Sequence, residues 1–123
     1  MLIEVSIGEI VDKLSILELK KLNIKDEDKL KNIIKEYDYL YDIVFNELKI
    51  DQDDFLSLFN INQTLWEVED RLRNKEKIKA FNSEFVELAR LVYITNDKRS
   101  DIKKQINIKY DSTFIEEKSY SPY

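Results

Sequence analysis

Cysteine and histidine are both absent from this chain of 123 residues. Without cysteine, the protein can form no disulfide, no thiolate nucleophile and no cysteine-based zinc or iron–sulfur site. Without histidine, it lacks the usual general base near neutral pH, every histidine-based catalytic triad and imidazole ligands for metals. Any chemistry must therefore rest on carboxylates, lysine, arginine, serine, threonine or tyrosine.

Glycine and proline each occur once, so few residues interrupt regular structure and long elements are expected. No stretch approaches 18 consecutive apolar residues, which argues against a membrane-spanning helix. The opening residues, MLIEVSIGE, have neither the basic region nor the long apolar run of a signal peptide. These features predict a cytoplasmic protein.

A basic stripe is also missing. The 20 basic and 25 acidic side chains are interspersed and give a net charge of −5, so nucleic acid is not expected as a partner. The composition, 43% hydrophobic and 37% charged, is typical of a folded helical protein. The length suits one domain with its own core.

Four segments carry apolar residues at the three- and four-residue spacing of an α-helix. Their expected bounds are residues 6–23, 27–49, 54–77 and 83–108. Ser6 and Glu9 fit a capping box, in which each side chain binds the backbone of the other. Asp26 is the expected N-cap of the second helix, and Asn82 or Ser83 that of the fourth.

Short connections between long helices favour antiparallel neighbours. The sequence therefore predicts an all-α fold, an antiparallel bundle of four helices over residues 1–108. Residues 109–123 contain the only proline and are expected to form an irregular C-terminal tail that packs on the bundle. The first two helices carry apolar residues on more than one face, which predicts a homodimer.

Arg99 interrupts the apolar stripe of the fourth helix. The stripe consists of Phe85, Leu88, Val92, Thr95, Arg99, Ile102 and Ile106. A guanidinium there needs a carboxylate or a ligand, because burying an unpaired charge costs several kcal/mol or more. Glu18, Glu69 and Asp70 flank the stripes of other helices and are the candidate partners. A structural ion pair is the favoured interpretation.

The alternative is a ligand pocket, in which Arg99 receives an anionic group while Thr95 and Asn96 add hydrogen bonds. Trp66 follows the apolar position Leu65 and could form a pocket wall, although a core or interface aromatic is the more common role. None of the seven tyrosines has a neighbour in the sequence that would favour an activated phenolate.

The acidic pairs Glu67/Asp70 and Glu84/Glu87 each have i,i+3 spacing. Two such pairs on facing helices could hold Mg²⁺ through oxygen ligands. The pattern loosely resembles the magnesium motifs of the all-α nucleotide pyrophosphohydrolases, although their order is reversed here. Ordinary surface charge is the favoured explanation, so no cofactor and no metal ligand is predicted.

Several sequence blocks resemble an uncharacterised family of short bacterial and viral proteins, a domain of unknown function. They are EVSIGEIVDKLSILE (4–18), LWEVED (65–70), the ELARLVYITNDKR region (87–99) and EEKSY (116–120). The resemblance implies a small helical protein without an assigned activity. Polar residues of these blocks form the candidate ligand-binding cluster: Asp12, Glu18, Trp66, Glu69, Asp70, Thr95, Asn96, Asp97 and Arg99.

Two functions follow from this sequence. The favoured one is a non-enzymatic helical interaction or accessory protein that forms a homodimer and has a further protein partner. The alternative is a small enzyme or anionic-ligand binder that uses carboxylates and Arg99, similar to a magnesium-dependent nucleotide hydrolase. A helical dimer like chorismate mutase would need several interior arginines, and only one is visible.

Overall fold

The computed structural model describes residues 1–123 and contains four α-helices and no strand. In chain order the helical elements are α1 (Ile7–Asn23), α2 (Glu27–Tyr41), the π-helix η1 (Asp42–Glu47), α3 (Gln52–Lys77) and α4 (Ser83–Lys109). The all-α class and the four helices are thus confirmed. The bounds of α1, α3 and α4 lie within two residues of those expected.

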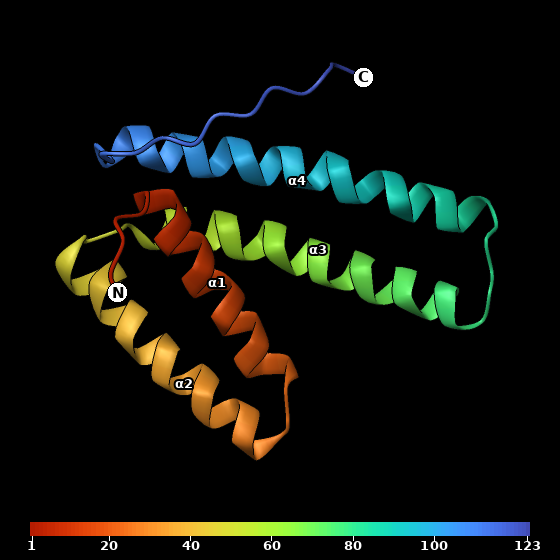
Figure 1. Ribbon diagram of the computed structural model, residues 1–123, viewed down its shortest axis with the longest axis horizontal. Coiled ribbons are helices and arrows are strands. Elements are labelled where there is room, and N and C mark those ends of the chain that lie inside the picture. The colour runs from red at the N-terminus through yellow and green to blue at the C-terminus, as the bar shows by residue number, and fades with distance from the viewer.

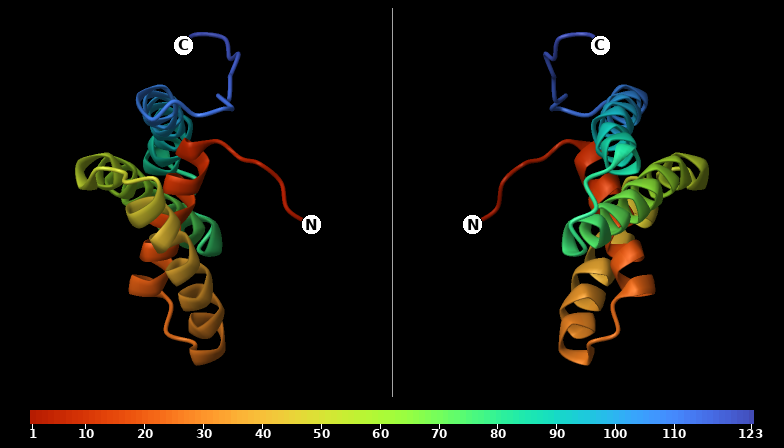
Figure 2. Two further views of the ribbon diagram at one scale, coloured as in Figure 1. Left: turned by 90° about the vertical axis from the view of Figure 1, so that its left-hand side faces the viewer. Right: turned by 90° about the vertical axis from the view of Figure 1, so that its right-hand side faces the viewer.

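The helices form two hairpins, α1–α2 and α3–α4 (Figure 1). α1 lies at the centre, where the two hairpins meet, and the helix packing is consistent with a bundle. α1 packs against all three other α-helices, whereas α2 packs against α1 and η1 only. α4 returns along α3, and both extend well past α1 (Figure 1). Viewed along the molecule, the α1–α2 hairpin points away from the α3–α4 pair (Figure 2).

The main apolar core lies where α1 meets the other elements. Its buried members are Val11, Leu14, Leu17, Ile33, Leu40, Val44, Ile50, Phe55, Leu58 and Ile106. No member comes from residues 62–101, so the distal ends of α3 and α4 pack mainly on each other. We call this part, residues 70–92, the α3–α4 arm.

The second helix differs from its prediction, because residues 27–49 do not form one continuous α-helix. A π-helix occupies Asp42–Glu47, and the N–H of Leu48 donates to the carbonyl five residues earlier (2.8 Å). Leu40, Val44 and Leu48 are spaced by four, and in an α-helix they would drift by about 80° around the axis. The wider turn keeps these apolar side chains directed at the core.

Three helix starts confirm the predicted N-caps Ser6, Asp26 and Asn82. Each side chain accepts a hydrogen bond from the backbone N–H three residues later. The return bond expected from the Glu9 side chain is not formed. The Glu9 carboxylate instead pairs with Lys103 of α4 (Oε2–Nζ 2.6 Å), because α4 lies within reach of the first turn of α1.

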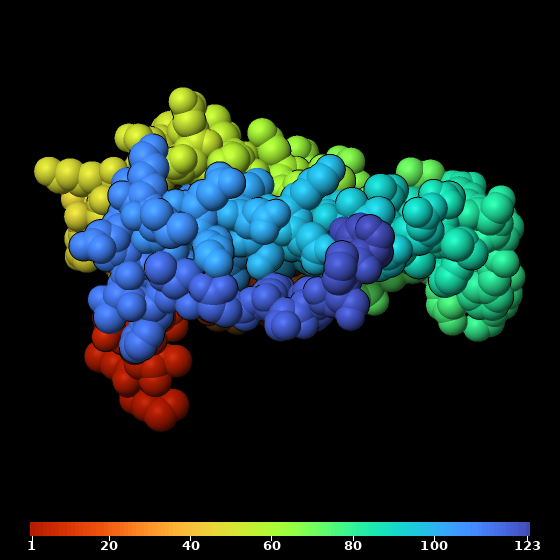
Figure 3. Space-filling view, turned by 90° about the horizontal axis from the view of Figure 1, so that it is seen from above, coloured from red at the N-terminus to blue at the C-terminus, as the bar shows by residue number.

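The residues after Tyr110 have no regular structure and lie along one side of α4 (Figure 3). Several contacts join this C-terminal tail to the helices. The Ser112 hydroxyl accepts from the N–H of Ile7 (3.0 Å), Glu117 pairs with Lys104 (2.8 Å), and the Tyr123 hydroxyl donates to an aspartate of α4 (2.7 Å).

No helix of the structure combines the length and the apolar composition that crossing a bilayer requires.

Candidate functional site

Arg99 of α4 forms a two-point ion pair with Asp12 of α1. The Arg99 Nε donates to Asp12 Oδ1 (2.9 Å), and Nη2 donates to Oδ2. The Asp12 side chain is 1% exposed and that of Arg99 is 28% exposed. Bidentate pairs of this kind are among the stronger hydrogen-bonded ion pairs. The interruption of the apolar stripe is therefore matched by a buried carboxylate.

Asn62 of α3 completes this polar centre. Its Nδ2 donates to Asp12 Oδ1 (2.8 Å) and to the Ser15 hydroxyl (2.7 Å), and that hydroxyl donates to the backbone carbonyl of Asp12 (2.7 Å). Hydrogen bonds to Asp12 raise the pKa of Arg99, and burial opposes them. The network joins α1, α3 and α4 where they meet and keeps their buried polar groups satisfied.

The partners predicted for Arg99 are wrong. Glu69 and Asp70 are exposed, and Glu18 lies on another side of α1, next to Tyr37 of α2. Glu18 is six residues from Asp12, which turns the two side chains about 120° apart around the helix axis. Because α1 is packed on two sides, its polar residues meet different neighbours.

Tyr37 and Glu18 form a separate contact between α1 and α2. Burial raises the pKa of Tyr37, and the hydrogen bond and negative charge of Glu18 raise it further. One carboxylate oxygen of Glu18 is buried without a hydrogen-bond partner, and Lys21 lies 3.8 Å from it. This contact lies on a different side of α1 from the Asp12–Arg99 pair and faces α2.

A pocket of about 220 Å³ opens in the angle between α1 and the α3–α4 pair. We call it the elbow pocket, and its lining residues are Ile16, Leu19, Asn62, Leu65, Trp66, Glu69, Asn96 and Arg99. Four residues of the predicted cluster meet here: Trp66, Glu69, Asn96 and Arg99. Their role in binding a ligand stays a prediction.

Of the rest of the predicted cluster, Asp12 binds Arg99 directly, and the other residues lie elsewhere. Thr95 is buried in α4, and Asp70 is exposed on α3. Asp97 faces the C-terminal tail, where its carboxylate accepts from the Tyr123 hydroxyl (2.7 Å). That hydrogen bond raises the pKa of Tyr123.

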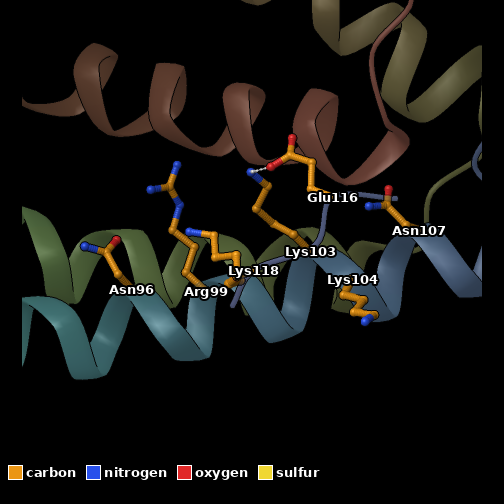
Figure 4. Close-up of a pocket in the computed structure, with 8 residues that line it drawn as sticks. Asn96, Arg99, Lys103, Lys104, Asn107, Glu116 and Lys118 are labelled. Carbon is orange, nitrogen blue, oxygen red and sulfur yellow. Dashed lines mark ion pairs between the residues drawn. The ribbon is translucent and has the colours of Figure 1, made fainter. Parts of the chain in front are cut away.

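A second pocket, which sequence reasoning missed, lies between α4 and the C-terminal tail (Figure 4). We call it the tail pocket, and it is lined by Asn96, Arg99, Ser100, Lys103, Lys104, Asn107, Glu116 and Lys118. Six of these residues recur along α4 at alternating spacings of three and one. That polar stripe beside the apolar one was the available signal, but only the fold reveals that the tail covers it.

Of the acidic residues considered for Mg²⁺, Glu84 and Glu87 are directed at basic neighbours, whereas Glu67 and Asp70 are exposed on α3. Glu84 pairs with Arg71 (2.7 Å) and Lys75 (3.0 Å), and Glu87 pairs with Arg90 (2.9 Å). Hydrogen bonds from Lys75 and Arg71 lower the pKa of Glu84. No group of three or more acidic side chains lies close enough together to hold a metal ion.

Comparison with known proteins adds a family and a partial likeness. The model of a family described as "Family of unknown function (DUF6165)" matches residues 1–123. Peptide chain release factor 1 of Borreliella burgdorferi strain ZS7 is 36% identical over 111 residues, which cover 88% of this chain and 28% of the release factor.

Peptide chain release factor 1 of Borrelia garinii subsp. bavariensis is 37% identical over 99 residues, which cover 78% of this chain and 24% of that protein. The chain thus spans about a quarter of the length of these relatives. No solved structure matches the chain.

Proposed function

We propose that this chain, which belongs to the DUF6165 family of unknown function, is a non-enzymatic helical interaction protein that forms a homodimer through its α3–α4 arm. The observation that carries the proposal is the arm itself. It extends past α1 and α2 as only two packed helices (Figure 1). It also presents an open apolar groove.

The groove lies between the facing helices of the arm. Its lining residues are Leu72, Arg73, Glu76, Phe85, Ala89 and Val92. Phe81 and Val86, which belong to the same part of α4 and its preceding loop, are each more than half exposed. Apolar surface gathered at one place commonly marks an interaction site.

A second copy of the chain is the occupant that the arm suits best. Two helical hairpins that pair by their apolar faces form a four-helix bundle, a common way to complete such a core. A two-fold contact sets the same patch of each copy against the other. Arg73 and Glu76 lie three residues apart at the rim, so Arg73 of one copy can face Glu76 of the other.

The Asp12–Arg99 pair supports a structural role for the polar centre. The carboxylate accepts from both Arg99 and Asn62, and the guanidinium uses two of its nitrogens on one partner. Groups engaged in this way join helices and set their register. The likeness to about a quarter of a release factor also fits a module that works through contacts with other parts of a protein.

A magnesium-dependent nucleotide hydrolase is the less favoured function. It would need carboxylates that converge on a metal, whereas Glu84 and Glu87 pair with basic side chains. An anionic ligand would also find Arg99 engaged by Asp12. Binding of an anion would then depend chiefly on other cations.

Light scattering coupled to size-exclusion chromatography tests the homodimer. We expect a mass of about twice the 14.8 kDa of one chain. Ala89→Glu places a charge in the groove and should give a monomer with an unchanged helical circular dichroism spectrum. Gln105→Glu adds the same charge on an exposed part of α4 outside the groove and should leave the dimer intact.

A wild-type mass of 14.8 kDa at the highest attainable concentration would overturn the proposed dimer. A dimer that persists in Ala89→Glu with wild-type stability would overturn its assignment to the arm. The separate non-enzymatic part of the proposal would fail if the purified chain turned over a substrate and lost that activity in a pocket variant.

A further inference from the structure

We propose that the tail pocket binds a phosphate group, held by Lys103, Lys104 and Lys118 beside Arg99. The ligand class is a small oxyanion of phosphate type, either free or as a monoester. This inference does not depend on self-association, because the tail pocket and the α3–α4 arm lie on different parts of the molecule.

The electrostatics of the lining favour an anion. Four of the eight lining residues are cationic, only Glu116 is acidic, and none is apolar. This concentration of positive side chains occurs in a chain whose net charge is −5. Lysine and arginine gathered at one polar concavity raise the local concentration of anions and bind them with charge-assisted hydrogen bonds.

The cations differ in how fully they are already paired. Lys104 pairs with Glu117 of the tail (2.8 Å), which is an exposed and therefore weak ion pair. Lys118 forms no ion pair or hydrogen bond, and its Nζ lies 5.7 Å from the centre of the Tyr120 ring. Lys118 therefore brings an unneutralised charge to the pocket.

Lys103 lies at the centre of the site and is 15% exposed (Figure 4). Its Nζ binds Glu9 at 2.6 Å but lies 3.9 Å from Glu116. The longer separation exceeds that of a charge-assisted hydrogen bond, which is about 2.7–2.9 Å. Glu116 from the tail thus occupies the position of an anion without binding tightly, and a better acceptor can displace it.

The size and neutral donors of the pocket suit a phosphate group. The cavity volume is about 40 Å³, which is space for roughly three water molecules. Ser100 lines it with a hydroxyl. The carbonyl oxygen of the Asn107 side chain accepts from the N–H of Gly8 (2.6 Å), so its amide NH₂ remains as a donor. These donors exceed what a two-oxygen carboxylate can use.

Thermal unfolding with inorganic phosphate and with phenyl phosphate tests the site, with chloride used to keep the ionic strength constant. A ligand that binds only the folded state raises Tm in a saturable way. Lys104→Gln combined with Lys118→Gln should raise the Kd for phosphate about tenfold, equivalent to about 1.4 kcal/mol of binding free energy. Lys98→Gln removes a charge from an exposed position of α4 outside the pocket and should leave Kd unchanged.

Glu116→Gln provides a test that misfolding cannot imitate. It removes the competing carboxylate, so we expect tighter phosphate binding than in the wild type. A response to both probes would indicate an esterified phosphate ligand, and a response to inorganic phosphate alone would indicate the free ion.

The site would be overturned by any of three results. These are no saturable change in Tm with either probe, an unchanged Kd in the double lysine variant, or weaker binding in Glu116→Gln. The monomeric Ala89→Glu variant should bind phosphate like the wild type, which separates this test from that of the homodimer.

Discussion

The side-chain carbonyl of Asn107 accepts a hydrogen bond from the backbone N–H of Gly8, 99 residues earlier in the chain (2.6 Å). Asn107 is 1% exposed, so this bond is sealed from water. It satisfies one of the free N–H groups at the start of α1 with a side chain of α4. The contact brings two helix backbones close together and requires a residue without a side chain at position 8.

Gly8→Ala is expected to destabilise the protein by about 1–3 kcal/mol. A Cβ at this position would lie 2.6 Å from the backbone carbonyl oxygen of Lys103, so α1 and α4 would have to separate. Urea unfolding followed by circular dichroism measures the change. Gln63→Ala, at an exposed position of α3, is the control and should stay within about 0.5 kcal/mol. A Gly8→Ala variant as stable as the control would contradict the close approach.

Arg99→Ala is expected to cost about 3 kcal/mol of unfolding free energy, the lower end for a broken buried pair, since Arg99 is partly exposed. The loss arises because Asp12 stays buried without its cation. In an Asp12→Asn background, Arg99→Ala should lower the unfolding free energy much less. Chemical denaturation of the wild type, the two single variants and the double variant gives the coupling free energy between the two residues. A single-variant loss below about 0.5 kcal/mol would place Arg99 effectively in solvent.

Lys79→Gly is expected to stabilise the protein by up to about 1 kcal/mol. Lys79 follows α3 with φ of 58°, a left-handed conformation that glycine adopts without steric cost. Lys77→Gly, in the last turn of α3, should instead lose about 1 kcal/mol, because glycine disfavours a helix interior. Thermal unfolding of both variants measures these changes. Equal decreases in stability for the two variants would contradict the prediction for Lys79.

Asp54 is expected to make stability depend on pH in the acid range. Burial raises its pKa, but hydrogen bonds from Lys109 (2.8 Å) and Tyr110 (2.6 Å) outweigh burial and lower the pKa overall. A carboxyl with a lowered folded pKa stabilises the protein above its unfolded pKa of about 3.9, and that contribution disappears as the pH falls through the folded pKa.

Asp54→Asn should therefore be less stable than the wild type near neutral pH, and the difference should shrink in acid. Urea midpoints measured over the acid range test this. Asp53→Asn, at the exposed neighbouring position, is the matched control and should change the stability near neutral pH less than Asp54→Asn does. A constant difference for Asp54→Asn would contradict the expected linkage.

The sequence predicted the helices well because their signals are local. Apolar spacing and the caps Ser6, Asp26 and Asn82 depend on residues a few positions apart. The break at Asp42 was missed, although the four-residue spacing from Leu40 to Leu48 was its sign. The π-helix forms because Leu40, Val44 and Leu48 all pack on the same core, which the sequence alone does not show.

The candidate site could be located from sequence only in part. Periodicity alone determined that Arg99 falls in an apolar stripe and must be neutralised. It pointed to Glu18, Glu69 and Asp70 as partners, which was wrong, since a helical stripe shows that a face is buried and not which neighbour it meets. The tertiary structure decided for Asp12, because α1 is enclosed on two sides and presents Asp12 to α4 and Glu18 to α2.

The sequence by itself determined that this protein is helical, where three of its four helices start and end to within two residues, and which basic residue needs a partner. The tertiary structure alone decided that α1 lies at the centre, that Gly8 meets Asn107, and that the tail returns over α4 to enclose a polar pocket. The physical reason is the range of the interactions. Capping and helical spacing act within a few residues, whereas these contacts join groups that only packing brings together.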